Sequence, residues 1–278
     1  MPIVRIRHCV AFLTFVLLNA LAQTSPQVSG AIQSALNNQL NGKIITLREF
    51  HPGKELRFTA DGHYQGKDEQ GPWTLWSKLM VTAIEVGNEA VTIKGRRVHV
   101  GYNVKQGRFM NIESKQQAAI AIEFAGTPIT SESVRTALER LFLGKEGHLS
   151  SFVPQEWQGV LKLEEAGSLQ SLSAVGRKEK DKKLVRTLPA VTAPKVISAP
   201  DPEYQREARD AGWQGTVILS AFVNEDGRVS DVRISRPLGM GLDEKAIEAV
   251  RKWRFESAKK AGVPVKSQIN IEVNFRVW

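Results

Sequence analysis

The sequence predicts an α+β protein in two folded parts. Short segments of alternating or β-branched residues fill residues 40–163, which predicts a mostly antiparallel β domain with one helix. A small, charged and then proline-dotted stretch from 164 to 199 is typical of a flexible linker. Residues 200–278 mix helical and strand patterns, which predicts a three-stranded antiparallel sheet packed on helices.

The N-terminus has the pattern of a secretory signal peptide. Arg5 and Arg7 precede an apolar run of about fourteen residues, whereas a membrane-spanning helix needs roughly 20. The run closes with Ala20-Leu21-Ala22, a small-x-small cleavage site followed by polar residues. We therefore expect residues 1–22 to be removed from an exported protein, with a retained inner-membrane anchor as the alternative.

Composition and cysteine content narrow the function classes. The chain has 278 residues and a formal net charge of +9, and its single cysteine, Cys9, lies in the expected leader. The mature chain would therefore hold no disulfide. Its positive charge suits anionic lipid, acidic cell-wall polymer or acidic partner segments. Zinc-finger spacings, recognition-helix patterns and glycine-rich phosphate loops are absent from the sequence, so we expect neither nucleic-acid binding nor a cofactor.

Turn signals divide the first domain into short strands. A lead segment, 23–39, comes before it, and residues 28–40 favour either a short helix with a polar face or disorder. Asp61-Gly62, Gly87-Asn88 and Lys94-Gly95 are among the turn dipeptides, and we expect a small antiparallel barrel or sandwich. The expected strands are Lys43–Phe50, Glu55–Ala60, Trp73–Trp76, Met80–Val86, Ala90–Ile93, Arg96–Tyr102, Phe109–Glu113 and Ala118–Phe124.

One amphipathic helix follows these strands. Ser131 is the expected N-cap and Gly144 the expected end. The apolar positions at helical spacing are Val134, Ala137, Leu138, Leu141 and Phe142. We expect this helix to pack against one end of the β domain.

A catalytic first domain is a second function class, and its residues argue against it. The histidines beyond the leader are His51, His63, His99 and His148. None of them stands at the H-x-x-x-H or H-E-x-x-H spacing of a metal site, and Ser150-Ser151 has no nucleophile-elbow context. We therefore expect neither a metal nor an enzyme activity.

A third class is a cell-wall or lipid-binding protein. Its candidate surface is basic and includes Lys94, Arg96 and Arg97 together with Arg177–Lys183. The second group lies in the expected linker, where a short helix within 179–185 is an alternative to extended chain.

Residues 200–278 predict the order helix, strand, strand, helix, strand. Pro202–Ala211 suits a short helix. Thr216–Val223 and Arg228–Ser235 suit two strands joined by the hairpin turn Asn224-Glu225-Asp226-Gly227. A second helix begins at Leu242. Its apolar stripe is Ala246, Ile247, Val250 and Trp253.

The last strand has the clearest pattern in the chain. From Ser267 to Val277, apolar and polar residues alternate with a period of two, which predicts a strand with one buried face. The apolar set is Ile269, Ile271, Val273, Phe275 and Val277. A terminal strand can form a sheet edge whose unpaired backbone groups accept a strand from a partner.

The residues of this part resemble the C-terminal domain of the TonB energy-transducer family. The matching motifs are Pro202-Glu-Tyr204-Gln-Arg-Glu-Ala208-Arg209, Gly212-Trp-Gln-Gly215-Thr-Val217, Val223-Asn-Glu-Asp226-Gly227-Arg-Val229, Leu242-Asp243, Trp253-Arg254-Phe255 and Gly262-Val-Pro264-Val. Gln205 stands where the family usually has a proline after the tyrosine. The resemblance covers about a quarter of the chain.

The resemblance implies a function in the periplasm. Domains of this family bind a short extended segment of TonB-dependent outer-membrane transporters as an added strand. It implies a non-catalytic binding protein linked to transport, with a membrane-anchored energy transducer as the alternative. A homodimer paired through the terminal strands is a further alternative. The implied partner-binding residues are Tyr204, Gln205, Arg206, Gln268, Asn270, Glu272 and Asn274.

Overall fold

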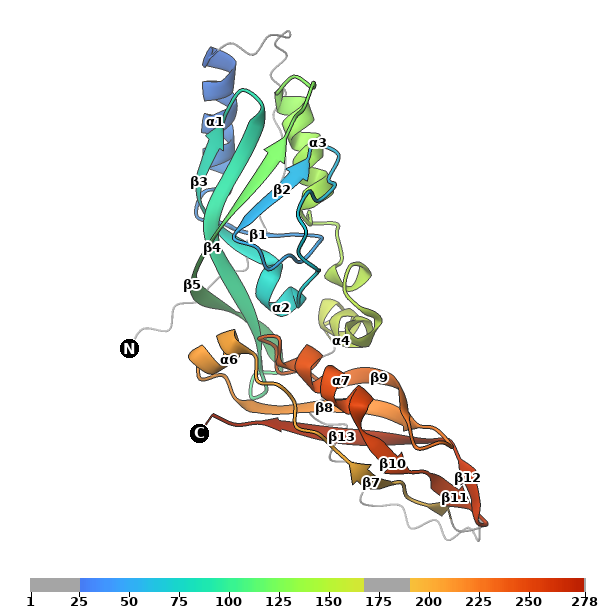
Figure 1. The fold of residues 1–278 in the computed structure, drawn as a ribbon. Coiled ribbons are helices and arrows are strands. Elements are labelled where there is room, and N and C mark those ends of the chain that lie inside the picture. The colour runs from blue at the N-terminus through green and yellow to red at the C-terminus, as the bar shows by residue number, and fades with distance from the viewer. Residues whose placement is uncertain (1–25, 168–190, 278) are drawn as a thin grey trace. The chain divides into compact units, whose positions relative to one another are not determined.

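The computed structural model describes residues 26–167 and 191–277 (Figure 1). The expected signal peptide, 1–22, lies outside the described residues. So do the central part of the expected linker and its alternative helix within 179–185. Within the described ranges, no helix combines the length and the apolar character needed to cross a membrane.

Two compact units make up the fold, and the division does not follow the chain in simple order. Of the described residues, unit 1 comprises 26–99 and 111–152. Unit 2 comprises 100–110, 153–167 and 191–277. Part of the sequence expected to belong to the first β domain is therefore a component of unit 2.

Unit 1 is built on a five-stranded sheet with the order β1-β3-β4-β5-β2. The β1–β3 and β3–β4 pairs are antiparallel, whereas β2 is parallel to β5. The sheet has two free ends, β1 and β2, so the expected barrel or sandwich is wrong and the expected mostly antiparallel β domain is confirmed. The strands are β1 (Ile44–Thr46), β2 (Glu55–Thr59), β3 (Lys78–Val86), β4 (Ala90–Asn103) and β5 (Arg108–Glu123).

Two local expectations in this unit are wrong for identifiable reasons. Trp73–Trp76 forms the helical turn α2, not a strand, because Pro72 starts the turn and accepts the backbone N–H of Trp76. Lys94-Gly95 is no turn, since β4 continues through it. A Cβ at Gly95 would lie 2.2 Å from the carbonyl oxygen of Met80, so glycine allows the two strands to approach closely there.

Helices α1 (Pro26–Leu40) and α3 (Ser131–Leu141) complete the core of unit 1. Residues 28–40 are helical, and Ile32, Leu36 and Leu40 are buried at helical spacing. The apolar stripe expected for α3 is confirmed, although Phe142 is its C-cap. The N-cap of α3 is Thr130 rather than Ser131. Its hydroxyl accepts the Ser133 N–H, and the Ser133 hydroxyl accepts the Thr130 N–H in return.

The main sheet of unit 2 is three-stranded and antiparallel, with the order β13-β8-β9, as expected. Its strands are β8 (Gly215–Val223), β9 (Val229–Arg236) and β13 (Ser267–Phe275). The hairpin turn between β8 and β9 also forms as expected. Gly227 has φ +78°, and a Cβ there would lie 1.9 Å from the carbonyl oxygen of Phe255, so only glycine fits.

Among the described residues of unit 2 are three helices: α4 (Gln155–Glu165), α6 (Arg206–Asp210) and α7 (Leu242–Lys252). Both α4 and α7 pack on β9 (Figure 1). Ala246, Ile247 and Val250 of α7 are buried as expected. Trp253 differs from expectation. It is the half-buried C-cap of α7, and its indole N–H donates to the carbonyl of Pro200 at 3.0 Å.

Two small sheets extend unit 2. One has the order β10-β7 and the other β12-β11-β6. Their strands are β6 (Val191–Thr192), β7 (Lys195–Ser198), β10 (Arg254–Glu256), β11 (Ala258–Lys260) and β12 (Val263–Val265). The last residues of the expected linker therefore form paired strands, because short β-branched segments lie between its prolines.

A short stretch of β4 adds a further pairing within unit 2. Tyr102 donates its backbone N–H to the carbonyl of Leu238 at 2.9 Å, and Met240 donates to the carbonyl of Val100 at 2.8 Å. The buried carboxylate of Asp243 accepts the N–H groups of Leu238 and Gly239 at 2.8 and 2.5 Å. These bonds fix the connection between β9 and α7.

Candidate binding edge

The outer edge of β13 is the structural feature that fits the expected strand addition. Along its inner side β13 pairs with β8 over its whole length, from Ser267 opposite Val223 to Phe275 opposite Gly215. Within the part of the chain that the structure describes, no strand pairs with its other side. In an antiparallel edge strand, every second residue directs its N–H and C=O away from the sheet. β13 therefore presents a row of backbone donors and acceptors.

The side chains of β13 alternate as the sequence predicts up to Phe275, where the strand ends, whereas Val277, expected on the buried face, is exposed. Ile271, Val273 and Phe275 are buried, whereas the polar residues on the other face are exposed. The exposed residues are Gln268, Asn270, Glu272 and Asn274. The side chain of Asn274 is engaged, because the hydroxyl of Thr216 on β8 donates to its amide oxygen at 2.7 Å. The other three make no side-chain hydrogen bond within the described residues, so they are available to a partner.

Tyr204 lies at the C-terminal end of β13. Its ring meets Phe275 edge to face, with centroids 5.5 Å apart and planes at 86°. The hydroxyl donates to the carbonyl of Trp213 at 2.7 Å, and partial burial raises the pKa of the Tyr204 phenol. The guanidinium carbon of Arg209 is 5.4 Å from the ring centroid. Tyr204 is therefore fixed in place, with an aromatic and cationic neighbour.

Gln205 and Arg206 make contacts within α6. Gln205 is the N-cap residue, and its side-chain amide donates to the carboxylate of Glu207 at 2.7 Å. Arg206 is exposed and lies 3.8 Å from Asp210. The helix expected over Pro202–Ala211 is shorter in the structure, because α6 begins only at Arg206.

The four polar residues of β13 form a line along one face of the strand, whereas Tyr204 contacts Phe275 on the buried face, and the printed contacts of Gln205 and Arg206 are local to α6. Tyr204 lies at the end of β13 that carries Asn274. Gln268 lies six positions back along the strand, which is about 20 Å at the usual rise of a strand. Such a spacing suits an extended polypeptide and does not suit a small ligand held on several sides.

Neighbouring strands contribute residues that sequence reasoning did not assign to the site. On the exposed face, Ile218 of β8 lies opposite Glu272, and Phe222 lies opposite Gln268. The ammonium of Lys266 is 4.6 Å from the centroid of the Phe222 ring. The alternation of Ile218, Ser220 and Phe222 was visible in the sequence, but which strand lies beside which was not.

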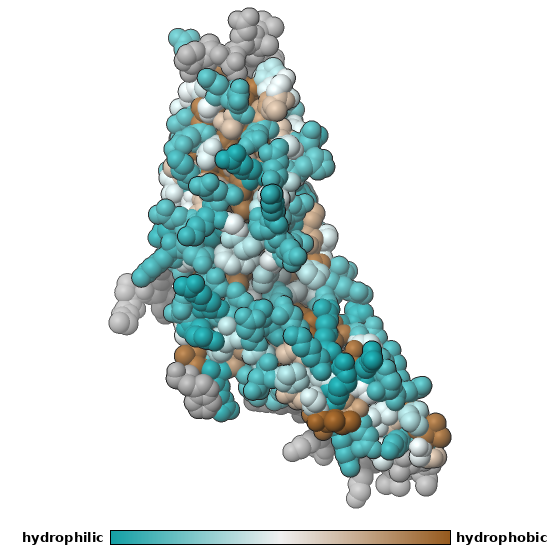
Figure 2. Space-filling view, viewed as in Figure 1, coloured by the Kyte–Doolittle hydropathy of each residue, from teal (hydrophilic) through white to brown (hydrophobic). Residues whose placement is uncertain are grey.

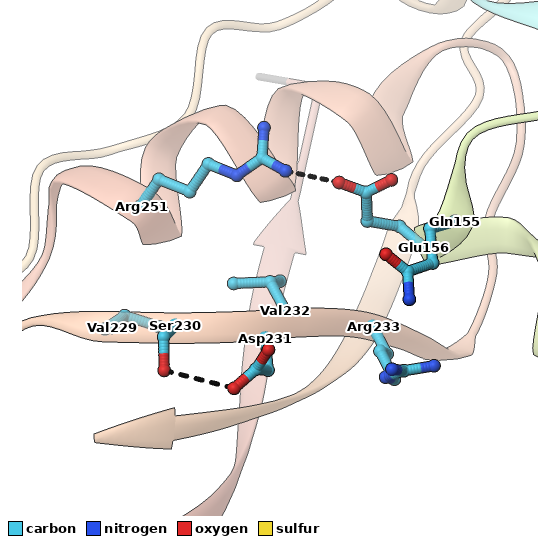
Figure 3. A pocket seen from close by; sticks show the side chains of 8 residues that line it. All are labelled: Gln155, Glu156, Val229, Ser230, Asp231, Val232, Arg233 and Arg251. Carbon is cyan, nitrogen blue, oxygen red and sulfur yellow. Dashed lines mark hydrogen bonds and ion pairs between the residues drawn. The ribbon is translucent and has the colours of Figure 1, made fainter. Parts of the chain in front are cut away.

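The opposite outer strand, β9, is occupied differently. A cavity of about 230 Å³ lies between β9 and the ends of α4 and α7 (Figure 3). Arg251 points toward Glu156 and forms an ion pair with it, and the hydroxyl of Ser230 donates to Asp231 at 3.3 Å. Because α4 and α7 both pack on β9, whereas the principal neighbour of β13 is β8, β13 is the more accessible edge.

Unit 1 corrects one further expectation. Arg97, expected on a basic binding surface, is only 1% exposed. Its guanidinium donates to the carbonyls of Trp76 at 2.7 Å, His51 at 2.9 Å and Gly53 at 2.7 Å. Burial lowers the pKa of Arg97 to about 10. Arg97 joins loops within the unit. Lys94 and Arg96 of the expected basic surface are exposed, and Arg177–Lys183 lies outside the described residues.

His51 of unit 1 packs against an aromatic ring and lies near two carboxylates. His51 stacks on Tyr64 with ring centroids 3.6 Å apart, and its ring nitrogens lie 3.2 Å from Glu49 and 3.6 Å from Asp68. Within residues 26–167 and 191–277, no three His, Cys, Asp or Glu side chains gather as a metal site would require. The expectations of no metal and no catalysis stay predictions.

Comparisons with known proteins concern unit 2. Residues 200–277 match the family model described as Gram-negative bacterial TonB protein C-terminal. Protein tonB2 of Pseudomonas aeruginosa is 32% identical over 79 residues, which are 28% of this chain and 29% of that protein. Protein TonB of Vibrio cholerae is 33% identical over 89 residues, 31% of this chain and 36% of that protein.

A solution NMR structure of the Pseudomonas aeruginosa TonB CTD is 26% identical, with a TM-score of 0.27. It covers 31% of this chain and 88% of that chain. The chain spans about a third of the length of the curated relatives it matches. The resemblance expected for the C-terminal part is confirmed by the sequence matches, and they concern that part alone.

Proposed function

We propose that this chain, whose residues 200–277 form a C-terminal domain of the TonB type, is an exported, non-catalytic binding protein of the bacterial cell envelope. Its partner is an extended segment of an outer-membrane transporter, which joins the sheet of unit 2 beside β13. The observation that supports this most is the outer edge of β13, along which no strand of the described residues pairs.

Strand addition at this edge would use backbone groups for most of the affinity. β13 has nine residues, so it can align with a partner segment of similar length. A strand laid along it would exchange hydrogen bonds with every second residue of β13. The exposed side chains of Gln268, Asn270 and Glu272 would lie beside the partner's side chains on the same face and set its register.

The Tyr204 contact gives the docking edge a fixed end. Tyr204 is held through its hydroxyl and through Phe275, so the terminal part of β13 is supported by the contact of a half-buried tyrosine with a buried phenylalanine. A supported end lowers the ordering cost of binding, because the strand does not have to form when the partner arrives. The conformational entropy lost on binding would then come mainly from the partner segment.

Site-directed crosslinking in the intact protein tests this proposal. In a Cys9→Ser background, Asn270→Cys places a thiol on the exposed face of β13. Attachment of a photoactivatable crosslinker to this thiol should capture a segment of an outer-membrane transporter in envelope preparations. Thr82→Cys is the matched control, since Thr82 is also exposed on a strand but lies on β3, between β1 and β4.

Two outcomes would count against the proposal. Equal capture from positions 270 and 82 would show that attachment is not specific to β13. Capture of nothing but a second copy of this chain from position 270 would show that the edge serves a homodimer through the terminal strands.

A further inference from the structure

Four exposed apolar side chains lie on the short strands of unit 2 that precede the docking edge. Val191 of β6 is 55% exposed, Val263 of β12 is 63% exposed, and Ile197 of β7 is 70% exposed. Val196 of β7, at 56%, completes the group, which we name the apolar tip. Figure 2 shows hydrophobic surface over this part of unit 2. Valine and isoleucine at these exposures leave a large apolar area in water.

Strand pairing places Val191 and Val263 on either side of one residue, and Val196 and Ile197 lie in the adjoining sheet β10-β7. In the sheet β12-β11-β6, Lys260 lies between Val263 on one side and Val191 on the other. Residues directly opposite each other in antiparallel strands share a face, so the two valines flank the lysine on one face. β7 pairs with β10, which leads through Ser257 into β11. A register shift between Arg254 and Phe255 leaves Ile197 without a partner in this ladder.

The apolar tip includes the tight hairpin that joins β11 and β12. Only Ala261 and Gly262 separate the paired residues Lys260 and Val263. Both have positive φ, 52° and 83°, as a two-residue turn between antiparallel strands requires. The backbone on either side of the turn is paired within the hairpin. Such a tip can enter a less polar medium without bringing a long run of unpaired backbone groups with it.

Basic side chains surround the apolar tip. They are Lys195, Arg254, Lys259 and Lys260, on strands β7, β10 and β11. Lys266, which follows β12, is paired with Asp231 at 3.2 Å. The one acidic residue on strands β6, β7, β10, β11 and β12 is Glu256, and the ammonium of Lys259 lies 2.8 Å from it. That pairing holds the pKa of Glu256 below its usual value. The surroundings of the apolar tip therefore carry an excess of positive charge at neutral pH.

We propose that the apolar tip docks on the surface of an anionic lipid bilayer. Apolar side chains flanked by lysines are the pattern of segments that lie at a membrane interface, where the lysines reach the headgroups. The positive rim is complementary to an anionic leaflet. A projecting hairpin suits a broad soft surface, and these side chains line neither the cavity beside β9 nor the one beside Phe58 and Phe152. This docking is independent of strand addition at β13.

Lipid docking would also orient the binding edge. Lys266 alone separates β12 from β13, so the start of the docking edge follows directly on the apolar tip. A bilayer contact at Val263 would hold Ser267 and the residues after it close to the headgroups. A transporter segment emerging from the same membrane would then meet β13 at short range.

A fluorescent label at the tip tests the lipid contact directly. In a Cys9→Ser background, the intact protein carries Val263→Cys labelled with NBD, a dye whose emission rises and shifts to shorter wavelength in lipid. Vesicles of phosphatidylcholine and phosphatidylglycerol supply the anionic surface, and pure phosphatidylcholine vesicles supply the neutral one. We expect a several-fold rise in emission on the anionic vesicles only. Val104→Cys is the matched control, an exposed valine elsewhere in unit 2.

A charge variant gives the second arm. Lys259→Gln with Lys260→Gln, in the labelled protein, should weaken binding to anionic vesicles by about fivefold for each lysine. If the protein attached to vesicles through its N-terminal apolar run instead, the labels at positions 263 and 104 would respond alike. Equal responses at the two positions would therefore overturn the proposal. It would also be overturned if the label at 263 stays in water on anionic vesicles. The same holds if this label is shielded by a second copy or a protein partner in the absence of lipid.

Discussion

Glu244, in the first turn of α7, carries an unusual protonation equilibrium. The indole N–H of Trp157 on α4 donates to one oxygen of its carboxyl group at 3.0 Å, and the other oxygen is buried without a hydrogen-bond partner in the described residues. Burial raises the pKa of Glu244 to about 7, against an ordinary value of 4.5, although the Trp157 hydrogen bond opposes the shift. The neighbouring Asp243 is also buried, and its pKa is raised in the same direction.

The sign of the resulting pH dependence follows from linkage. A carboxyl group whose folded-state pKa is raised is protonated more readily in the folded state than in the unfolded state. The folded state therefore loses stability as pH rises from about 4.5 through about 7, where Glu244 ionises in its buried position. We expect the ionisation of Glu244 to make unit 2 less stable at pH 8 than at pH 5, by roughly 2–3 kcal/mol from this group.

Glu244→Gln tests the origin of this dependence. The amide stays neutral at every pH, and its carbonyl oxygen can still accept the Trp157 N–H. We predict that urea unfolding, followed by tryptophan fluorescence, shows a smaller loss of stability between pH 5 and pH 8 in the variant. The pH dependence that remains in the variant comes from Asp243, whose pKa is also raised. Identical pH profiles for the wild type and the variant would contradict the assignment to Glu244.

Elements with a complete local code were predictable from the sequence. The period of two in β13 fixed which side chains are buried. The turn Asn224–Gly227 and the apolar stripe of α3 were equally local signals. Elements that depend on distant contacts were not predictable. Trp73–Trp76 contains residues typical of strands, yet it is a helical turn in which all four side chains are buried.

The residues of the candidate site were likewise predictable only where a local pattern places them. The exposed residues of β13 follow from alternation, so Gln268, Asn270 and Glu272 could be named from sequence. The contact of Tyr204 with Phe275 spans most of the C-terminal part and needed the fold. Likewise, no local pattern distinguishes Arg97, a buried residue bound to three carbonyls, from the exposed arginine next to it.

The N-terminus of α3 offers a test at the scale of one element. Thr130 and Ser133 exchange hydrogen bonds between hydroxyl and backbone, whereas Ser131 lies inside the first turn. We predict that Thr130→Ala lowers the free energy of unfolding of unit 1 by about 1 kcal/mol. Ser131→Ala should change it by less than about 0.5 kcal/mol. Thermal unfolding of the two variants decides between the caps, and a larger loss for Ser131→Ala would contradict the structure.

At the scale of the whole molecule, the N-terminus decides between a free binding protein and an anchored transducer. The small-x-small site at Ala22 predicts that Arg5 and Arg7 are absent from the mature chain. Intact-mass spectrometry of protein isolated from the periplasmic fraction should give a chain that starts at Gln23. Recovery of a chain containing Arg5 from salt-washed membranes would favour the anchored alternative.

Docking along β13 and lipid contact at the apolar tip place two different demands on unit 2. The first needs backbone groups, which salt affects little, and the second needs lysines, which salt screens. Partner capture from position 270 should therefore persist at high ionic strength, while the fluorescence change at position 263 declines. The two activities can be separated in one preparation.

Amide hydrogen exchange in the intact, unbound protein measures the central claim most directly. Within β13, from Ser267 to Phe275, the amides that bond to β8 should exchange slowly and the alternate, outward-directed amides rapidly. The account predicts this two-residue alternation by NMR, and slow exchange of the outward set once a partner strand is added. Uniformly slow exchange along β13 in the free protein would mean that the edge is already covered, and it would contradict the proposed function.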